Sequence, residues 1–232
     1  DKSLASTLNG KQDLSPTSKM IILNEDTEEF VDMDGKTIGP FKKGQLLNLD
    51  SKISEILVGL EMLEISTYHL IKPEEVENYN LKDSLELLDS KSEYKFLRPN
   101  LLVPMLRILS ENKDTEYPQK LFEIGRVFNK NAQKENGIEE KDNLIISMAP
   151  ANATEIKRRL DYLFKMLNIE YSIKEISKPQ LIEGRTCAII TNNKQIGYFG
   201  EVHPNILRKQ GIQMPTVIAE ISLEEIYNTI NN

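Results

Sequence analysis

One apolar run with a charged residue inside it constrains this chain more than any other segment. Residues 121–128 read Leu-Phe-Glu-Ile-Gly-Arg-Val-Phe, and the Phe, Ile and Val residues favour a β-strand. Gly125 in the middle predicts a bulge or a close backbone approach. Arg126 is unusual in so apolar a run, so we expect it to form a buried structural ion pair with an acid such as Glu123 or Glu201.

The rest of the larger part of the chain mixes strands and helices. Apolar residues at helical spacing predict helices over 51–60, 101–112 and 153–167. Short apolar runs predict further strands at 64–70, 143–148, 169–173, 184–190, 195–202 and 217–221. The polar stretch 130–142 is expected to be a turn or an exposed loop. The pattern predicts an α+β fold in which antiparallel strands are flanked by helices.

The first fifty residues predict two separate parts. Residues 1–19 are polar and without periodicity, which is typical of a flexible leader or linker. Residues 20–50 predict a small β-rich unit with a hairpin turn at Asp34-Gly35, a loop around Gly39-Pro40 and a strand at 46–49. Residues 51–232 then form the larger domain.

Composition and charge exclude several classes of function. The formal net charge of -7 argues against broad, sequence-independent nucleic-acid binding, which needs a cationic face. The single Cys187 cannot form an internal disulfide and fits a reducing, cytoplasmic location. No apolar run is long enough to cross a bilayer, so no membrane partner is expected. His69 and His203 lie far apart in sequence, so we expect no metal site.

Five blocks resemble one family when they are taken in order. They are Ile56–Leu60 with Glu64–Leu70, Glu93-Tyr94 with Leu97–Leu102, Tyr117–Gly125, Gly184-Arg185, and Gly197–Pro204. Together they span about 51–227 and resemble the C-terminal synthetase-like module of the phenylalanyl-tRNA synthetase β subunit, archaeal and eukaryotic type. The resemblance implies a class II aminoacyl-tRNA synthetase fold. Glu61-Met62 departs from it, because that family usually has Gly-Phe there.

The resemblance also implies that this chain does not itself activate amino acids. Phe122–Phe128 resembles the second class II signature motif, which continues into Arg-x-Glu, but Asn129 and Asn131 stand at those two positions. The motif Arg holds the α-phosphate of ATP through two charge-assisted hydrogen bonds, which a neutral Asn cannot supply. The third motif is missing as well, since its nearest candidate carries the acid Glu201. We therefore expect no catalytic residue and no cofactor in this chain, with ATP and magnesium only in the whole synthetase.

A partner and a set of structural residues follow from the same resemblance. The module is expected to pack on the α subunit, mainly through its first helix and strand, and to reach tRNA only indirectly. The expected subunit-interface residues are Ile53, Ile56, Leu57, Leu60 and Tyr68. The expected structural anchors are Arg98, Glu123, Arg126, Arg185, Glu201 and His203, the last as a cap where a strand ends.

Two alternative functions stay open at this point. Residues 20–60 also resemble the small C-terminal domain of archaeal GINS replication proteins, through Phe30-Val31, Asp34–Lys36 and Gly39–Gly44. That resemblance implies a protein-interaction module with replisome partners, joined to the synthetase-like part as a fusion or a chimera. The other alternative is an active small-molecule ligase on the same fold, which would catalyse pyrophosphate exchange with phenylalanine and ATP.

Overall fold

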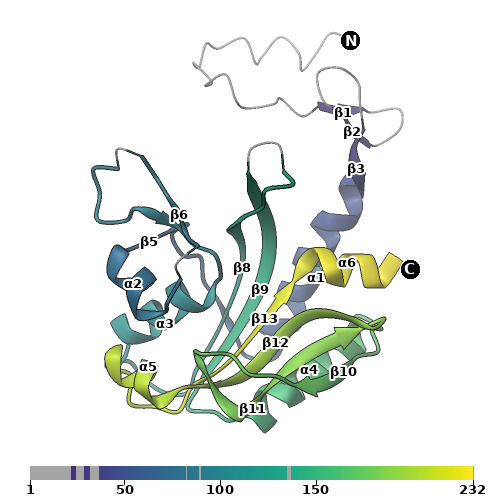
Figure 1. The fold of residues 1–232 in the computed structure, drawn as a ribbon. Helices are drawn as coiled ribbons and strands as arrows, with labels where there is room; N and C mark the ends of the chain where they lie inside the picture. Colours follow the sequence, from purple (N-terminus) through teal and green to yellow (C-terminus); the bar gives the residue numbers. More distant parts are fainter. Residues whose placement is uncertain are drawn as a thin grey trace. The chain divides into compact units, whose positions relative to one another are not determined.

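The computed structural model describes residues 22–24, 29–31, 37–81, 83–88, 90–134 and 137–231. The chain divides into two compact units at the junction of Leu49 and Asp50 (Figure 1). The smaller unit contains a three-stranded antiparallel sheet in the order β1-β2-β3, made of β1 (Ile22–Asn24), β2 (Glu29–Val31) and β3 (Thr37–Lys42). Helix α1 (Lys43–Gly59) begins in this unit and ends in the larger one.

Two predictions for the smaller unit are wrong. Gly39-Pro40 lies within β3 and not in a loop, and residues 46–49 lie within α1 and not in a strand. In the sequence, Leu46 and Leu49 continue at helical spacing into Ile53 and Leu57, and a run of four apolar residues cannot by itself separate a strand from a helix. Residues 1–19 and the Asp34-Gly35 turn lie outside the described residues.

The larger unit is built on a seven-stranded sheet in the order β10-β11-β12-β13-β9-β8-β4. Its neighbouring strands are antiparallel except β4 and β8, which are parallel. The strands are β4 (Leu63–Glu64), β8 (Gln119–Lys130), β9 (Ile138–Ala149), β10 (Ser172–Glu175), β11 (Leu181–Thr191), β12 (Lys194–Val202) and β13 (Val217–Ser222).

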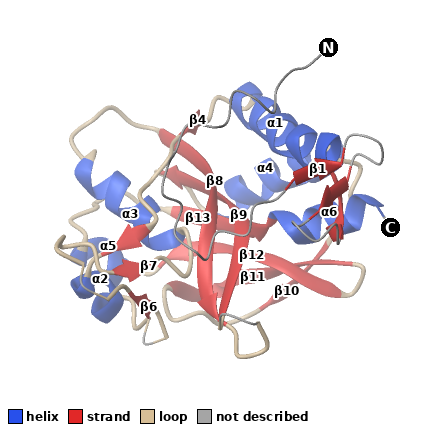
Figure 2. Cartoon of the chain, turned by 90° about the horizontal axis from the view of Figure 1, so that it is seen from above, coloured by secondary structure: helices blue, strands red, loops and turns tan. Residues whose placement is uncertain are grey.

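Helices cover this sheet, and a second small sheet lies beside it. The helices of the larger unit, besides the end of α1, are α2 (Pro73–Asn78), α3 (Leu102–Glu111), α4 (Ala153–Met166), α5 (Pro204–Lys209) and α6 (Leu223–Asn231). The small sheet has the order β5-β7-β6, from β5 (Leu70–Ile71), β6 (Leu85–Glu86) and β7 (Phe96–Leu97). Figure 2 shows α2, α3 and α5 grouped together, away from α4. The α+β fold is therefore confirmed.

The strand register gives the large sheet two chemically different faces. Phe122, Ile146, Ala219 and Phe199 stand opposite one another across β8, β9, β13 and β12. All four are buried, and α4 packs against β12 and β13. The next row holds Glu123, Ile145, Glu220 and Tyr198. Since successive side chains point to opposite faces, this second row lies on the other face and brings two acids onto it.

Strand boundaries differ from the prediction in three places. The stretch 138–142 belongs to β9 and pairs with 126–130 of β8, where a loop was expected. Its side chains are mostly charged, so this part of β9 lacks the apolar run that predicts a strand. Of the strand expected at 64–70, only the two ends are strand, in β4 and β5. The strand expected at 169–173 begins later, at Ser172.

Helix α1 ends in a left-handed residue that is not glycine. The backbone N–H of Met62 donates to the carbonyl of Leu57 at 3.1 Å, and that of Glu61 donates to Val58 at 2.9 Å. These two bonds form a Schellman motif, with Glu61 at its left-handed position and a φ of 61°. This is the position at which the sequence departs from the Gly of the similar family.

At position 61, Gly should give a more stable chain than Ala. Gly adopts a positive φ without steric cost, so we expect Glu61→Gly to be more stable than Glu61→Ala by about 1 kcal/mol. Both variants lose the ion pair to Lys120 (2.8 Å) equally, so their difference isolates the backbone conformation. Urea unfolding of the two variants measures it, and equal free energies of unfolding would contradict the assignment.

Candidate functional site

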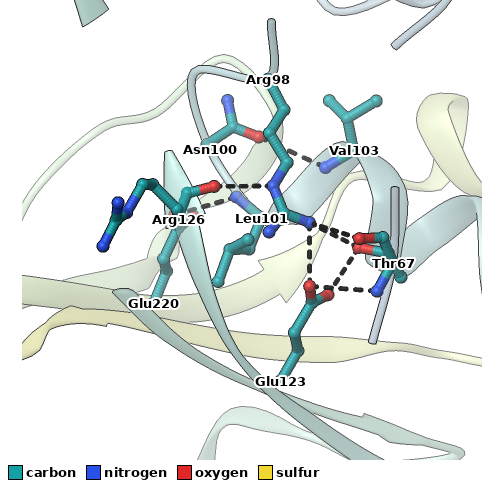
Figure 3. Close-up of polar contacts among 8 residues, drawn as sticks. All are labelled: Thr67, Arg98, Asn100, Leu101, Val103, Glu123, Arg126 and Glu220. Atoms are coloured by element: carbon teal, nitrogen blue, oxygen red, sulfur yellow. Dashed lines mark hydrogen bonds and ion pairs between the residues drawn. The ribbon is translucent and has the colours of Figure 1, made fainter. Parts of the chain in front are cut away.

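A buried ion pair joins β8 to the segment that precedes α3. Arg98 Nη1 lies 2.8 Å from Glu123 Oε1, and both side chains are only 1% exposed. The Thr67 backbone N–H and hydroxyl donate to the two Glu123 oxygens at 3.1 and 2.6 Å. Arg98 Nε donates to the backbone carbonyl of Arg126 at 2.8 Å. Figure 3 shows the guanidinium enclosed by these partners, so neither charge is left without a hydrogen bond.

Gly125 makes room for this pair. A Cβ atom at Gly125 would lie 2.5 Å from Arg98 Nη2 and 2.8 Å from Glu123 Oε1. The predicted close approach is therefore confirmed. The pairing of β8 with β9 runs through Gly125 without a register shift, so the alternative of a bulge is wrong.

Arg126 does not make the buried pair that its place in an apolar run suggested. It donates to Asp142 at 3.0 and 3.2 Å and to Glu140 at 3.2 Å, and its side chain is 49% exposed. The hydrogen bonds to Asp142 raise the pKa of Arg126 further, and both acids add to the effect. The physical reason is the strand period: residues 123 and 126 point to opposite faces. In Figure 3 the Arg126 side chain accordingly points away from Glu123.

The other expected anchors connect strands to helices. Arg185 Nη1 donates to Glu201 Oε2 at 2.6 Å, while Glu201 Oε1 accepts from the backbone N–H of Ala153, the first residue of α4. His203 Nδ1 accepts from the backbone N–H of Asn205 at 3.1 Å and forms the N-cap of α5. The predicted capping position of His203 is confirmed.

A second buried acid, Glu220, was missed by the sequence analysis. Its Oε1 accepts from the Leu101 backbone N–H at 3.0 Å and from Asn143 Nδ2 at 2.9 Å. Its Oε2 accepts from the Tyr198 hydroxyl at 2.8 Å. Burial, reinforced by the charge of Glu220, raises the pKa of Tyr198 well above its usual value. A lone acid inside the otherwise apolar run 217–221 was the signal that could have identified it.

These polar groups border a cleft of about 690 Å³. Tyr198 and Glu220 line it from β12 and β13, Asn129 and Lys130 line it from the end of β8, and Lys178 lines it from the segment between β10 and β11. Lys178 Nζ lies 3.7 Å from the centre of the Tyr198 ring. Burial lowers the pKa of Lys178, and the nearby Glu220 opposes that effect.

The two Asn residues at the signature positions bind the chain itself. Asn129 Nδ2 donates to the carbonyl of Pro99 at 3.4 Å. Asn131 Oδ1 accepts from the backbone N–H of Gln133 at 3.0 Å in the segment between β8 and β9. Neither residue brings a positive charge to the cleft. Among the described residues there is no group of three or more His, Cys, Asp or Glu side chains placed to hold a metal ion.

The expected interface residues divide by burial. Ile53 and Leu57 are fully buried, so the prediction that they contact a partner is wrong: their stripe of α1 is used inside the chain. Ile56 and Leu60 are partly buried, and Tyr68 is 58% exposed. Two exposed apolar residues were missed, Val58 (57%) on α1 and Leu63 (64%) on the edge strand β4. Within the described part of the chain, no helix is both long and apolar enough to cross a membrane.

Removing the charge of Glu123 should destabilise the chain strongly. Glu123→Gln leaves the Arg98 charge buried without its counter-charge, and we expect a loss of about 3–5 kcal/mol in the free energy of unfolding. Asp142→Asn is the matched control, because it makes the same chemical change at the half-exposed Arg126 pair and should cost under about 1 kcal/mol. Urea unfolding compares the two, and similar losses would refute the structural importance of the buried pair.

Tyr198→Phe should change both stability and its pH dependence. Near neutral pH the variant loses one hydrogen bond to buried Glu220, at a cost of about 1–2 kcal/mol. In the wild type the folded chain keeps a phenolic proton that the unfolded chain loses above a pKa of 10.0. The stabilisation is therefore complete below that value and falls as pH rises beyond it, by up to about 1.4 kcal/mol per pH unit.

In Tyr198→Phe, the free energy of unfolding should no longer include the fall at alkaline pH that the Tyr198 phenol contributes. Urea unfolding at about pH 8 and about pH 11 tests it. The half-exposed Tyr162 provides the control, since Tyr162→Phe should alter stability at the lower pH by less than about 0.5 kcal/mol. An alkaline slope identical in Tyr198→Phe and the wild type would contradict the assignment.

Comparisons with known proteins identify the family. A family model described as the phenylalanyl tRNA synthetase beta chain CLM domain matches residues 36–223. A phenylalanine–tRNA ligase beta subunit from Thermococcus sibiricus is 31% identical over 192 residues, covering 80% of this chain and 34% of the relative. One from Borrelia turicatae is 33% identical over 190 residues, covering 79% and 34%. The chain thus spans about a third of the length of these curated relatives.

A solved structure shows the same fold at low identity. The pyrrolysyl tRNA synthetase PylSc of Desulfitobacterium hafniense matches with a TM-score of 0.66 and 19% identity, covering 78% of this chain and 65% of that one. The predicted class II synthetase-like fold is therefore confirmed. The family match includes Gly39–Gly44, on which the GINS resemblance rested, and these comparisons give the GINS alternative no support. The chain belongs to the phenylalanyl-tRNA synthetase β-chain CLM-domain family.

Proposed function

We propose that this chain is a non-catalytic synthetase-like module of a phenylalanine–tRNA ligase β subunit. It supports charging of tRNA with phenylalanine by packing on the α subunit, in the cytoplasm, and touches tRNA only indirectly. The observation that carries the proposal is Asn129, which lines the cleft where the class II motif has a phosphate-binding Arg. Relatives that share this domain are named as β subunits of that ligase.

The chemistry of the cleft agrees with a supporting role. Activation of an amino acid builds negative charge on a phosphate, and removing one preorganised donor for such charge costs about 2.7–4 kcal/mol of transition-state stabilisation. Asn129 is neutral and its amide is bonded to Pro99. ATP and magnesium therefore belong to the whole synthetase and not to this chain.

Exposed apolar side chains near the start of the larger unit supply a docking surface. Leu63 lies on β4, one edge of the seven-stranded sheet, and Val58 lies in the last turn of α1. Tyr68 follows β4 and packs edge-on against Tyr94, with 5.5 Å between ring centres. The α subunit is the partner that the family assignment favours. Large exposed apolar groups close in sequence are typical of an interaction surface.

Leu63→Asp should abolish association with the cognate α subunit. A charge on β4 would be buried without a counter-charge in the complex, which weakens binding by about a hundredfold or more. Co-purification of the two chains, followed by size-exclusion chromatography, measures the loss. Because Leu63 is exposed in this chain, the variant should unfold at the same urea concentration as the wild type.

The matched control is Ile173→Asp. Ile173 is also an exposed apolar residue (42%), on β10 at the opposite edge of the sheet. We expect this variant to bind the α subunit as the wild type does. Equal losses of α-subunit binding in the two variants, or full binding by both, would contradict the assignment of the β4 edge as the docking surface.

A further inference from the structure

We infer that the cleft beside Tyr198 and Glu220 binds a small sugar phosphate, that is, a phosphomonoester that carries free hydroxyl groups. This site would be a property of the chain alone. It does not depend on the α subunit, and its test therefore fails or succeeds separately from the proposed function.

The cleft has the size of a small-molecule site. Its volume of about 690 Å³ lies within the roughly 300–1,000 Å³ that is usual for ligand pockets. Its lining comes from segments far apart in sequence, which include Ser84, Asn100, Lys130, Lys178 and Tyr198. The fold holds these segments in place partly through buried hydrogen bonds such as that from the Leu101 N–H to Glu220.

The charges of the cleft favour a dianion. Lys141 is paired with Glu139 at 3.0 Å, but Lys130 and Lys178 have no ion-pair partner within the part of the chain that the structure describes. Both lysines line the cleft, and two free ammonium groups match the charge of a phosphomonoester. Asp83 is the acid at the wall that opposes such a ligand.

Glu220 does not compete with a ligand for these lysines, because neither of its carboxylate oxygens is free of hydrogen bonds. Both of its carboxylate oxygens already accept hydrogen bonds, from the Leu101 N–H, Asn143 and the Tyr198 hydroxyl. Hydrogen bonds within the chain therefore hold the Glu220 carboxylate in the wall of the cleft. Lys178 lies over the ring of Tyr198 and not against the acid, which leaves its N–H groups for a ligand.

Unpaired polar atoms select a ligand with hydroxyl groups. Ser84 lines the cleft and is buried, and its Oγ has no hydrogen-bond partner among the described residues. Asn129 and Asn143 each donate one amide N–H, to Pro99 and Glu220, and no described residue donates to their Oδ1 atoms, which are available as acceptors. A buried polar group without a partner is costly. That cost applies to Ser84, since Asn129 and Asn143 are only partly buried. Sugar hydroxyls would donate to the Oδ1 atoms of the two Asn residues, whereas the acceptor oxygens of inorganic phosphate match the lysines.

NMR titration of the full 232-residue chain tests the inference. The probes are ribose 5-phosphate, ribose and inorganic phosphate. We expect saturable shifts with ribose 5-phosphate, with an affinity at least about tenfold above that for either of the other two. Equal affinities for ribose 5-phosphate and inorganic phosphate would overturn the sugar-phosphate assignment, and so would the absence of saturable shifts.

Variants locate the site. Lys178→Gln and Lys130→Gln should each weaken ribose 5-phosphate binding about tenfold, and the exposed position of Lys130 makes its variant safe for folding. Lys194→Gln is the matched control, because Lys194 is an exposed lysine paired with Glu225 and lies outside the cleft. It should bind as the wild type does. Binding that is unchanged in both cleft variants, or weakened equally in the control, would refute the site.

Discussion

The buried pair of Arg98 and Glu123 is the interaction on which the functional surfaces of this module depend. Both charges are removed from water, which is tolerable only because every partner is in place. Thr67 binds the carboxylate from one side, and the Arg126 carbonyl binds the guanidinium from another. The residues next to these partners carry the proposed functions. Thr67 precedes the exposed Tyr68, and Arg98 precedes the cleft wall at Pro99 and Asn100.

The sheet places its two buried acids in one row and gives each a separate task. Glu123 and Glu220 both stand opposite Ile145, on either side of β9. Glu123 neutralises Arg98, whereas Glu220 accepts hydrogen bonds from neutral donors. The second arrangement ties Leu101, at the start of α3, to β13. This face of the sheet is therefore partly occupied by hydrogen bonds within the chain, which agrees with the supporting role proposed for this module.

Lys130 and Lys178 bring positive charge to the cleft, but position 129 holds Asn where a class II ATP site has its phosphate-binding Arg. Lys130 at the end of β8 and Lys178 line the cleft in place of the motif Arg, and a lysine ammonium acts as a point charge without bidentate geometry. The proposed ligand is accordingly a small anion with hydroxyl groups, and Ser84, Asn129 and Asn143 are the polar cleft residues placed beside the lysines. The surface proposed for the α subunit and the cleft use different residues, so one can be lost while the other is retained.

Local pattern alone determined much of this protein. The strand at 121–128 and the helix beginning at Ala153 follow from residue types within one element. The turn at Asn192-Asn193 joins β11 to β12 and depends on local residue types as well. Both Asn residues of that turn adopt positive φ angles, of 47° and 61°, as Asn does more readily than most residues. The family resemblance, which rests on the order of short motifs, is local information of the same kind.

Only the tertiary structure decided which partners and which faces these residues have. Arg98 and not Arg126 receives Glu123, because the strand period turns Arg126 to the other face and a loop from another part of the chain brings Arg98 in. Ile53 and Leu57 face inward while Val58 and Leu63 face outward. Periodicity within one segment shows which residues share a face, but the partner of each face comes from segments far apart in sequence and is set only by the tertiary structure.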